Sequence, residues 1–175
     1  PHATPLQVMR IVDAGGPLPE VRVQHDFDAS DISSAAFGQN LPNWLLRREL
    51  VAHLAALPTV RFMPGVATAS VLGRESAALV GLSNGERFSA RLLIAADGRN
   101  SMIREAMNIG VQTVRYGQKA LSFSVTHPIP HHNITTEIHR SGGPFTLVPL
   151  QDRDGLPASA VVWMEKGEEI SRLVS

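Results

Sequence analysis

The residues of greatest chemical interest are Asp97, Gly98, Ser101 and Arg104, which directly follow the continuous apolar run 92–96. An acidic residue at the end of a buried strand can accept a hydrogen bond from a ribose hydroxyl or orient a basic neighbour. Ser101 can cap a helix, and Gly98 permits a positive φ or a close backbone approach. Ligands gather at the carboxyl ends of strands in open α/β sheets, which makes this segment a candidate nucleotide site. The alternative is a strand, a turn and a capped helix without any ligand.

The elements around this segment are typical of an α/β layer. The apolar run predicts a strand buried on both faces, followed by a short helix over 101–107. Asn43 is expected to open a longer helix that Pro58 ends. A short strand is expected over 59–63, and the remaining strands are expected over 67–72, 77–82 and 87–90, with a tight turn at 83–86.

The rest of the chain alternates apolar and polar residues, as antiparallel strands do. The predicted strands are 6–13, 21–25, 114–126, 133–139, 145–150 and 158–165, with a loop over 26–38 and a helix beginning at Glu168. Segments on both sides of the α/β insertion can form one sheet. We therefore expect three regions: strands over 1–38, part of an α/β domain over 39–110, and an antiparallel sheet over 111–175.

Composition excludes several classes of protein. The 175 residues are 43% apolar, and 16 basic residues balance 16 acidic ones, which argues against a nucleic-acid partner. No cysteine is present, so thiolate sites and disulfides are excluded. No apolar run approaches the roughly 20 residues of a membrane span. The absence of cysteine suits a cytoplasmic protein. Pro1 and the uncapped end at Ser175 suggest that N- and C-terminal parts of the protein are missing.

The run 91–104 resembles the second fingerprint of class A flavoprotein monooxygenases, the para-hydroxybenzoate hydroxylase-like family. In that family an apolar strand leads to Asp-Gly, then to a Ser, with an Arg three residues later. Asp97, Gly98, Ser101 and Arg104 stand at this spacing. The resemblance implies that Asp97 and Gly98 lie by the ribityl chain and pyrophosphate of FAD and affect the use of NAD(P)H. It also implies that Arg104 helps to hold the segment.

A second similar segment is the helix that begins at Asn43. The family helix carries an amide or basic side chain near the flavin, and Asn43 fits the amide position, with Arg47 and Arg48 as further cofactor candidates. The alternatives are that Asn43 is a plain N-cap and that the two arginines solvate the outer face of the helix. The predicted cofactor-binding residues are therefore Asp97, Gly98, Arg104, Asn43 and Arg47.

Two short segments resemble the ubiquinone-biosynthesis branch of the family. There, a Tyr-x-Gln opens a central strand of the substrate domain, as Tyr116 and Gln118 would, and a Pro-Leu ends a strand near the flavin, as Pro149 and Leu150 would. The resemblance spans about residues 6–163. It implies an α+β fold, in which an antiparallel substrate-domain sheet is joined to part of the FAD-binding α/β domain.

The family's other two FAD elements do not occur in the sequence. No Gly-x-Gly-x-x-Gly turn is present to bind the pyrophosphate, and the family's later Gly-Asp segment is missing. We therefore predict that this chain alone is inactive and binds FAD weakly or not at all.

The resemblance implies a parent enzyme that uses FAD, NAD(P)H and O₂ to hydroxylate an aromatic ring, with a polyprenylated ubiquinone precursor as first choice. A lipid-tailed substrate implies contact with a membrane or with a complex of biosynthetic enzymes, and hence a location in the cytoplasm peripheral to the inner membrane. The alternatives are a soluble phenol hydroxylase of catabolism or tailoring, and a non-catalytic α+β binding module.

Other side chains are less informative. The histidines at 127, 131, 132 and 139 lack zinc-site spacing, so no metal site is expected, and the sequence identifies no catalytic base. Six apolar residues suit either a substrate wall or an ordinary sheet core, and we favour the core: Leu121, Phe123, Val125, Leu147, Val161 and Trp163.

Overall fold

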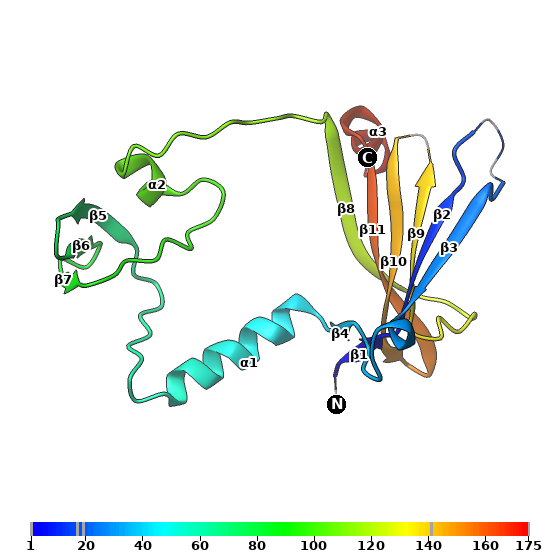
Figure 1. The fold of residues 1–175 in the computed structure, drawn as a ribbon, viewed down its shortest axis with the longest axis horizontal. Helices are drawn as coiled ribbons and strands as arrows, with labels where there is room; N and C mark the ends of the chain where they lie inside the picture. The colour runs from blue at the N-terminus through cyan, green and yellow to red at the C-terminus, as the bar shows by residue number, and fades with distance from the viewer. Residues whose placement is uncertain (1, 17, 19, 141, 175) are drawn as a thin grey trace. The chain divides into compact units, whose positions relative to one another are not determined.

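A computed structural model describes residues 2–16, 18, 20–140 and 142–174. The chain forms two compact units (Figure 1). The first unit contains residues 1–51 and 115–175, and the second contains residues 52–114. The three regions predicted at 1–38, 39–110 and 111–175 stay a prediction.

A six-stranded sheet forms the body of the first unit (Figure 1). Its order is β3-β2-β9-β10-β11-β8, and every pair is antiparallel except β2 and β9, which are parallel. The strands are β2 (Val8–Asp13), β3 (Val23–Asp28), β8 (Gln118–Thr126), β9 (Ile134–Arg140), β10 (Gly143–Arg153) and β11 (Leu156–Lys166). The expectation that one sheet joins segments from both sides of an insertion is confirmed.

One face of this sheet carries its apolar core. Strand side chains alternate between faces, and the register sets Leu147 beside Val161 and Val161 beside Phe123. Phe145 and Trp163 meet edge to face with ring centroids 5.8 Å apart. The sheet is followed by helix α3 (Gly167–Leu173), whose Ile170 is buried.

The predicted loop over 26–38 is shorter than expected. Strand β3 continues to Asp28 because it pairs with β2 as far as Val8, and Arg10 on β2 also forms an ion pair of 2.7 Å with Asp26 across the two strands. Within the same stretch, β4 (Gly38–Asn40) pairs with β1 (Thr4–Leu6) in a separate two-stranded sheet. Local polarity suggested a loop, but cross-strand pairing decided the conformation.

Helix α1 (Asn43–Ala56) begins where the sequence predicts and ends before Pro58. The amides of Leu45 and Leu46 both donate to the carbonyl of Pro42, which closes its first turn. Only Leu45 is buried among the described residues of this helix.

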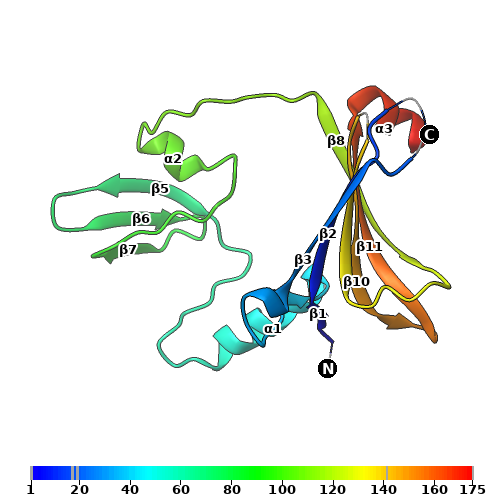
Figure 2. The ribbon, with the colours of Figure 1, turned by 45° about the vertical axis from the view of Figure 1, so that its right-hand side comes forward.

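The second unit contains a three-stranded antiparallel sheet and a short helix (Figure 2). The strands are β5 (Thr68–Gly73), β6 (Ala78–Leu82) and β7 (Arg87–Ala90), and the helix is α2 (Met102–Ala106). Met107, directly after α2, packs on β5. A Cβ added at Gly73 of that strand would stand 3.2 Å from Met107 Cε. These elements match the predicted strands, turn and helix.

Two predicted strands are wrong. Residues 59–63 and the apolar run 92–96 form no strand, and Leu92 and Ile94 are 73% and 77% exposed. A strand of a doubly covered sheet needs hydrogen-bonded neighbours and layers on both faces. No strand in the described part of the chain forms a hydrogen-bonded pair with the apolar run, so the run has no regular secondary structure and is largely exposed.

Candidate functional site

Asp97 and Ser101 form a hydrogen-bonded cap at the start of α2. Ser101 Oγ donates to Asp97 Oδ1 at 2.6 Å and accepts from the backbone N–H of Arg104 at 3.0 Å. The backbone N–H of Ile103 donates to Asp97 Oδ2 at 3.3 Å. Ser101 is buried, whereas Asp97 is exposed. The predicted cap is confirmed, and three of the predicted site residues lie in this one turn: Asp97, Gly98 and Arg104.

The charge of Asp97 is stabilised by its neighbours. The hydrogen bond from Ser101 is the largest cause that lowers the pKa of this carboxyl, and the backbone N–H of Ile103 contributes further. Gly98 has a φ of +88°, which a residue with a side chain rarely adopts, and the space beside it is open. An exposed carboxylate has lone pairs left after these two bonds, so it can also accept a hydrogen bond from a hydroxyl group.

We expect the cap on α2 to weaken in acid. Because the folded pKa of Asp97 lies below that of an unfolded Asp, ionisation favours the fold above the unfolded value. That contribution is lost as pH falls through the folded pKa. Exchange of the Ile103 and Arg104 amides should therefore accelerate in that acid range, beyond the intrinsic pH dependence of exchange.

The matched control is Asp97→Asn, which keeps the shape of the side chain but cannot titrate there. In this variant, exchange of the Ile103 and Arg104 amides should not accelerate in acid beyond its intrinsic pH dependence. If the Asn variant shows the same acid transition, another group is responsible and the assignment to Asp97 is wrong.

The first unit contains an open cavity of about 1380 Å³ next to the start of α1. Asn43 lines it, as do Asn40 on β4 and the polar residues 151–154 at the end of β10. The strand positions on its floor are mostly small: Ser124 pairs with Ala160, and Ala160 with Val148. One step along the sheet, Thr126 pairs with Ala158, and Ala158 with Leu150. The described lining residues from these strands are Ser122, Phe123, Ser124, Val125, Thr126, Val148, Leu150, Ala158 and Ala160.

The six apolar residues considered for a substrate wall occupy the alternate strand positions. Leu121, Leu147, Val161 and Trp163 are not among the described residues that line the cavity, whereas Phe123 and Val125 are. Val161 is only 2% exposed. The core interpretation therefore holds for Val161, while the sequence analysis missed the small residues of the cavity floor, such as Ser124, Ala158 and Ala160. The available signal was the small residue at every second position along β8 and in the first half of β11.

The remaining sequence candidates are divided between core, surface and cavity. Arg47 is exposed on α1 and is not among the described lining residues of the cavity. Tyr116 is 82% exposed, and the Gln118 amide donates to the carbonyl of Gly142 at 2.8 Å. Pro149 is fully buried. Asn43 and Arg47 belong to the first unit, and the Asp97 turn belongs to the second.

A protein-family model described as an FAD binding domain matches residues 1–172. The chain belongs to this FAD binding domain family. Two relatives of known function are also similar to it. Ubiquinone hydroxylase UbiL of Rhodospirillum rubrum is 29% identical over 174 residues, which cover 99% of this chain and 38% of that protein. The 3-demethoxyubiquinol 3-hydroxylase of Escherichia coli is 27% identical, with 84% and 37% covered. The chain thus spans less than two fifths of either relative.

Two solved structures share the fold. PqsL, a probable FAD-dependent monooxygenase from Pseudomonas aeruginosa, has a TM-score of 0.80 at 19% identity, covering 98% of this chain and 46% of that one. Klebsiella pneumoniae HpxO, complexed with FAD and uric acid, has a TM-score of 0.65 at 19% identity, covering 93% and 40%. The resemblance to class A FAD monooxygenases and the predicted fold class are confirmed. No helix in the described residues is long and apolar enough to cross a membrane.

Proposed function

We propose that the full-length gene product carrying this chain is an FAD-dependent monooxygenase that hydroxylates the aromatic ring of a ubiquinone precursor, using NAD(P)H and O₂. Membership of the FAD binding domain family carries the proposal. The two relatives named as ubiquinone-pathway hydroxylases support the choice of pathway.

The residues present fit part of an FAD molecule. Asn40 Nδ2 is buried beside the large cavity and has no hydrogen-bond partner among the described residues, and the amide of Asn43 lines the same cavity. Amide donors suit the acceptor edge of a flavin ring. Asp97 suits a hydroxyl of the ribityl chain, with Gly98 allowing close approach and the backbone of Arg104 fixing the turn. Arg47 is the weakest of the proposed contacts, because it does not line the cavity.

The cavity also supports an aromatic substrate. When bound, FAD would pass two electrons from NAD(P)H to O₂, so that one oxygen atom of O₂ enters the ring and the other leaves as water. The chain's own contribution is to position that ring and to exclude water from it. The small side chains of Ser124, Ala158 and Ala160 leave the sheet surface low enough for a flat ring to lie on it.

The cavity is open and measures about 1380 Å³, whereas typical small-molecule pockets measure about 300–1,000 Å³, so its walls leave room for a long substituent on the ring. The choice of a prenyl tail as that substituent rests on the two relatives named as ubiquinone-pathway hydroxylases. A tail of this kind is the reason to propose a cytoplasmic enzyme that associates peripherally with the membrane or with other biosynthetic enzymes.

Turnover by the full-length gene product tests the proposal. We expect NAD(P)H oxidation and ring hydroxylation with short-chain polyprenyl phenols, at a kcat/KM well above that with the same phenols lacking the tail. Product analysis by mass spectrometry must show one added oxygen, since NAD(P)H oxidation alone can be uncoupled from hydroxylation. A preference for tail-free phenols would favour a soluble phenol hydroxylase. A gene product with no flavin and no turnover would favour a non-catalytic binding module.

A further inference from the structure

The loop between β8 and β9 is attached to the sheet by two histidines with different hydrogen-bond partners. His127 Nδ1 lies 2.6 Å from the carbonyl of Ile129, and its Nε2 lies 2.9 Å from Ser159 Oγ. His131 Nε2 lies 3.0 Å from the carbonyl of Leu150, and its Nδ1 accepts from the backbone N–H of Asn133 at 3.1 Å. The loop is therefore bonded to both β10 and β11.

The partners of His131 define its protonation state. A carbonyl only accepts, so Nε2 must carry the proton in the bond to Leu150. A backbone N–H only donates, so Nδ1 must be bare in the bond from Asn133. His131 is therefore neutral and in the Nε2–H form. His127 is less restricted, because Ser159 Oγ can donate to a bare Nε2 or accept from a protonated one.

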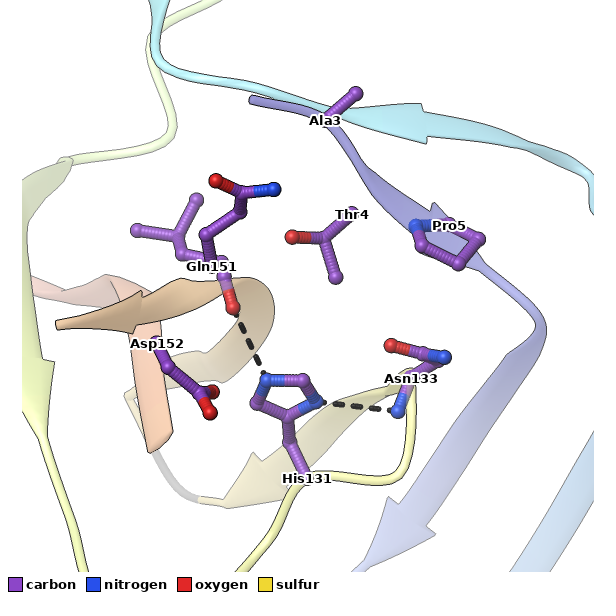
Figure 3. Close-up of a pocket in the computed structure, with 8 residues that line it drawn as sticks. Ala3, Thr4, Pro5, His131, Asn133, Gln151 and Asp152 are labelled. Atoms are coloured by element: carbon purple, nitrogen blue, oxygen red, sulfur yellow. Dashed lines mark hydrogen bonds between the residues drawn. The ribbon is translucent and has the colours of Figure 1, made fainter. Parts of the chain in front are cut away.

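The segment that His131 holds is a wall shared by two cavities. Leu150, Gln151 and Asp152 line the large cavity next to α1 and also line a smaller depression of about 430 Å³. Figure 3 shows the His131 ring on the side of the smaller depression, with its two hydrogen bonds. Thr4 and Asn133 also line this depression (Figure 3). The carbonyl that His131 binds therefore belongs to the strand segment that separates the two spaces.

We propose that neutral His131 is a positioning residue, which fixes the Leu150–Asp152 wall of the substrate cavity through the Leu150 carbonyl. This inference deepens the proposed function, because the wall shapes the space assigned to the aromatic substrate. It assigns His131 no contact with substrate or cofactor.

Nitrogen-15 NMR of histidine-labelled full-length protein tests the protonation state directly. At neutral pH we expect the Nε2–H neutral form for His131 and a protonated Nδ1 for His127. Assignment of either peak set uses the His131→Gln and His127→Gln variants. An imidazolium or an Nδ1–H form at position 131 would overturn the proposal.

Two substitutions separate the bonds that His131 makes. His131→Gln places an amide donor near the position of Nε2 and should keep the bond to Leu150, whereas His131→Asn places its amide near Nδ1 and should lose that bond. We expect hydrogen exchange over residues 148–154 to rise about five- to tenfold in the Asn variant, which is the loss of roughly one hydrogen bond. Exchange in the Gln variant should stay within about twofold of the wild type. Equal exchange in both variants would contradict the proposal.

Turnover by the full-length gene product supplies a signal that a purely structural role would not give. His131→Asn should raise KM for the phenol more than it lowers kcat, with rescue by His131→Gln. The NMR and exchange results do not depend on turnover, so the wall and the proposed reaction can fail separately.

Discussion

The 175-residue chain, purified alone, will be colourless, whereas the full-length gene product will be yellow with bound FAD. The chain supplies the Asp97 turn and the amides beside the large cavity, but its sequence contains no Gly-x-Gly-x-x-Gly turn for the pyrophosphate. Each charge-assisted hydrogen bond to a phosphate contributes about 1.5–3 kcal/mol, so the loss of several such bonds lowers the affinity by orders of magnitude. Visible absorbance and flavin fluorescence after gel filtration measure the difference.

Addition of FAD to the purified chain completes this test. We expect no saturable quenching of flavin fluorescence at micromolar FAD, while circular dichroism still reports the β-rich fold. Retention of flavin by the isolated chain would show that the residues of this chain suffice for FAD binding. Our division of the site between this chain and the rest of the protein would then be wrong.

In the full-length gene product, Asp97→Ala should lower FAD affinity or NAD(P)H-dependent reduction by about 10- to 100-fold, the effect of removing one hydrogen bond to a charged group. The physical reason is the second role proposed for this carboxylate. It caps α2 through Ser101 and Ile103, and it is exposed enough to accept a ribityl hydroxyl. FAD titration of the apoprotein and the rate of flavin reduction by NAD(P)H measure the two effects.

Ser101→Ala is the matched variant that isolates the capping role. It removes the hydroxyl that bonds Asp97 and the N–H of Arg104 but leaves the carboxylate in place, and it should cost about 1 kcal/mol of stability. We expect Asp97→Ala to impair cofactor use well beyond Ser101→Ala at equal thermal stability. Equal losses in both variants would show that Asp97 only turns and caps the chain.

Features that depend on near neighbours in the chain could be predicted from the sequence. Ser101 is the N-cap of α2 as expected, since a serine reaches the amide of the third residue after it by local geometry. Helix α1 begins at Asn43 and ends before Pro58, since Pro42 and Pro58 restrict the backbone at its two ends. The family could be recognised because the Asp97-to-Arg104 spacing is one continuous segment.

The error at 92–96 shows the limit of this reasoning. Five consecutive apolar residues indicate burial, but burial requires partners from other segments, and Leu92 and Ile94 are exposed in the described structure. The composition of the run indicates a preference for a buried position. It does not show which segments of the protein would cover it.

The tertiary structure alone decided which residues form the cavity. The sequence by itself determined the family, the Asp97 turn and the alternation in each strand. Whether Ser124 meets Ala160, and whether His131 reaches the carbonyl of Leu150, depends on the register between strands that are distant in sequence. Alternation gives each strand two faces but does not say which face is covered, so only the assembled sheet puts the small residues on the cavity side and Val161 in the core.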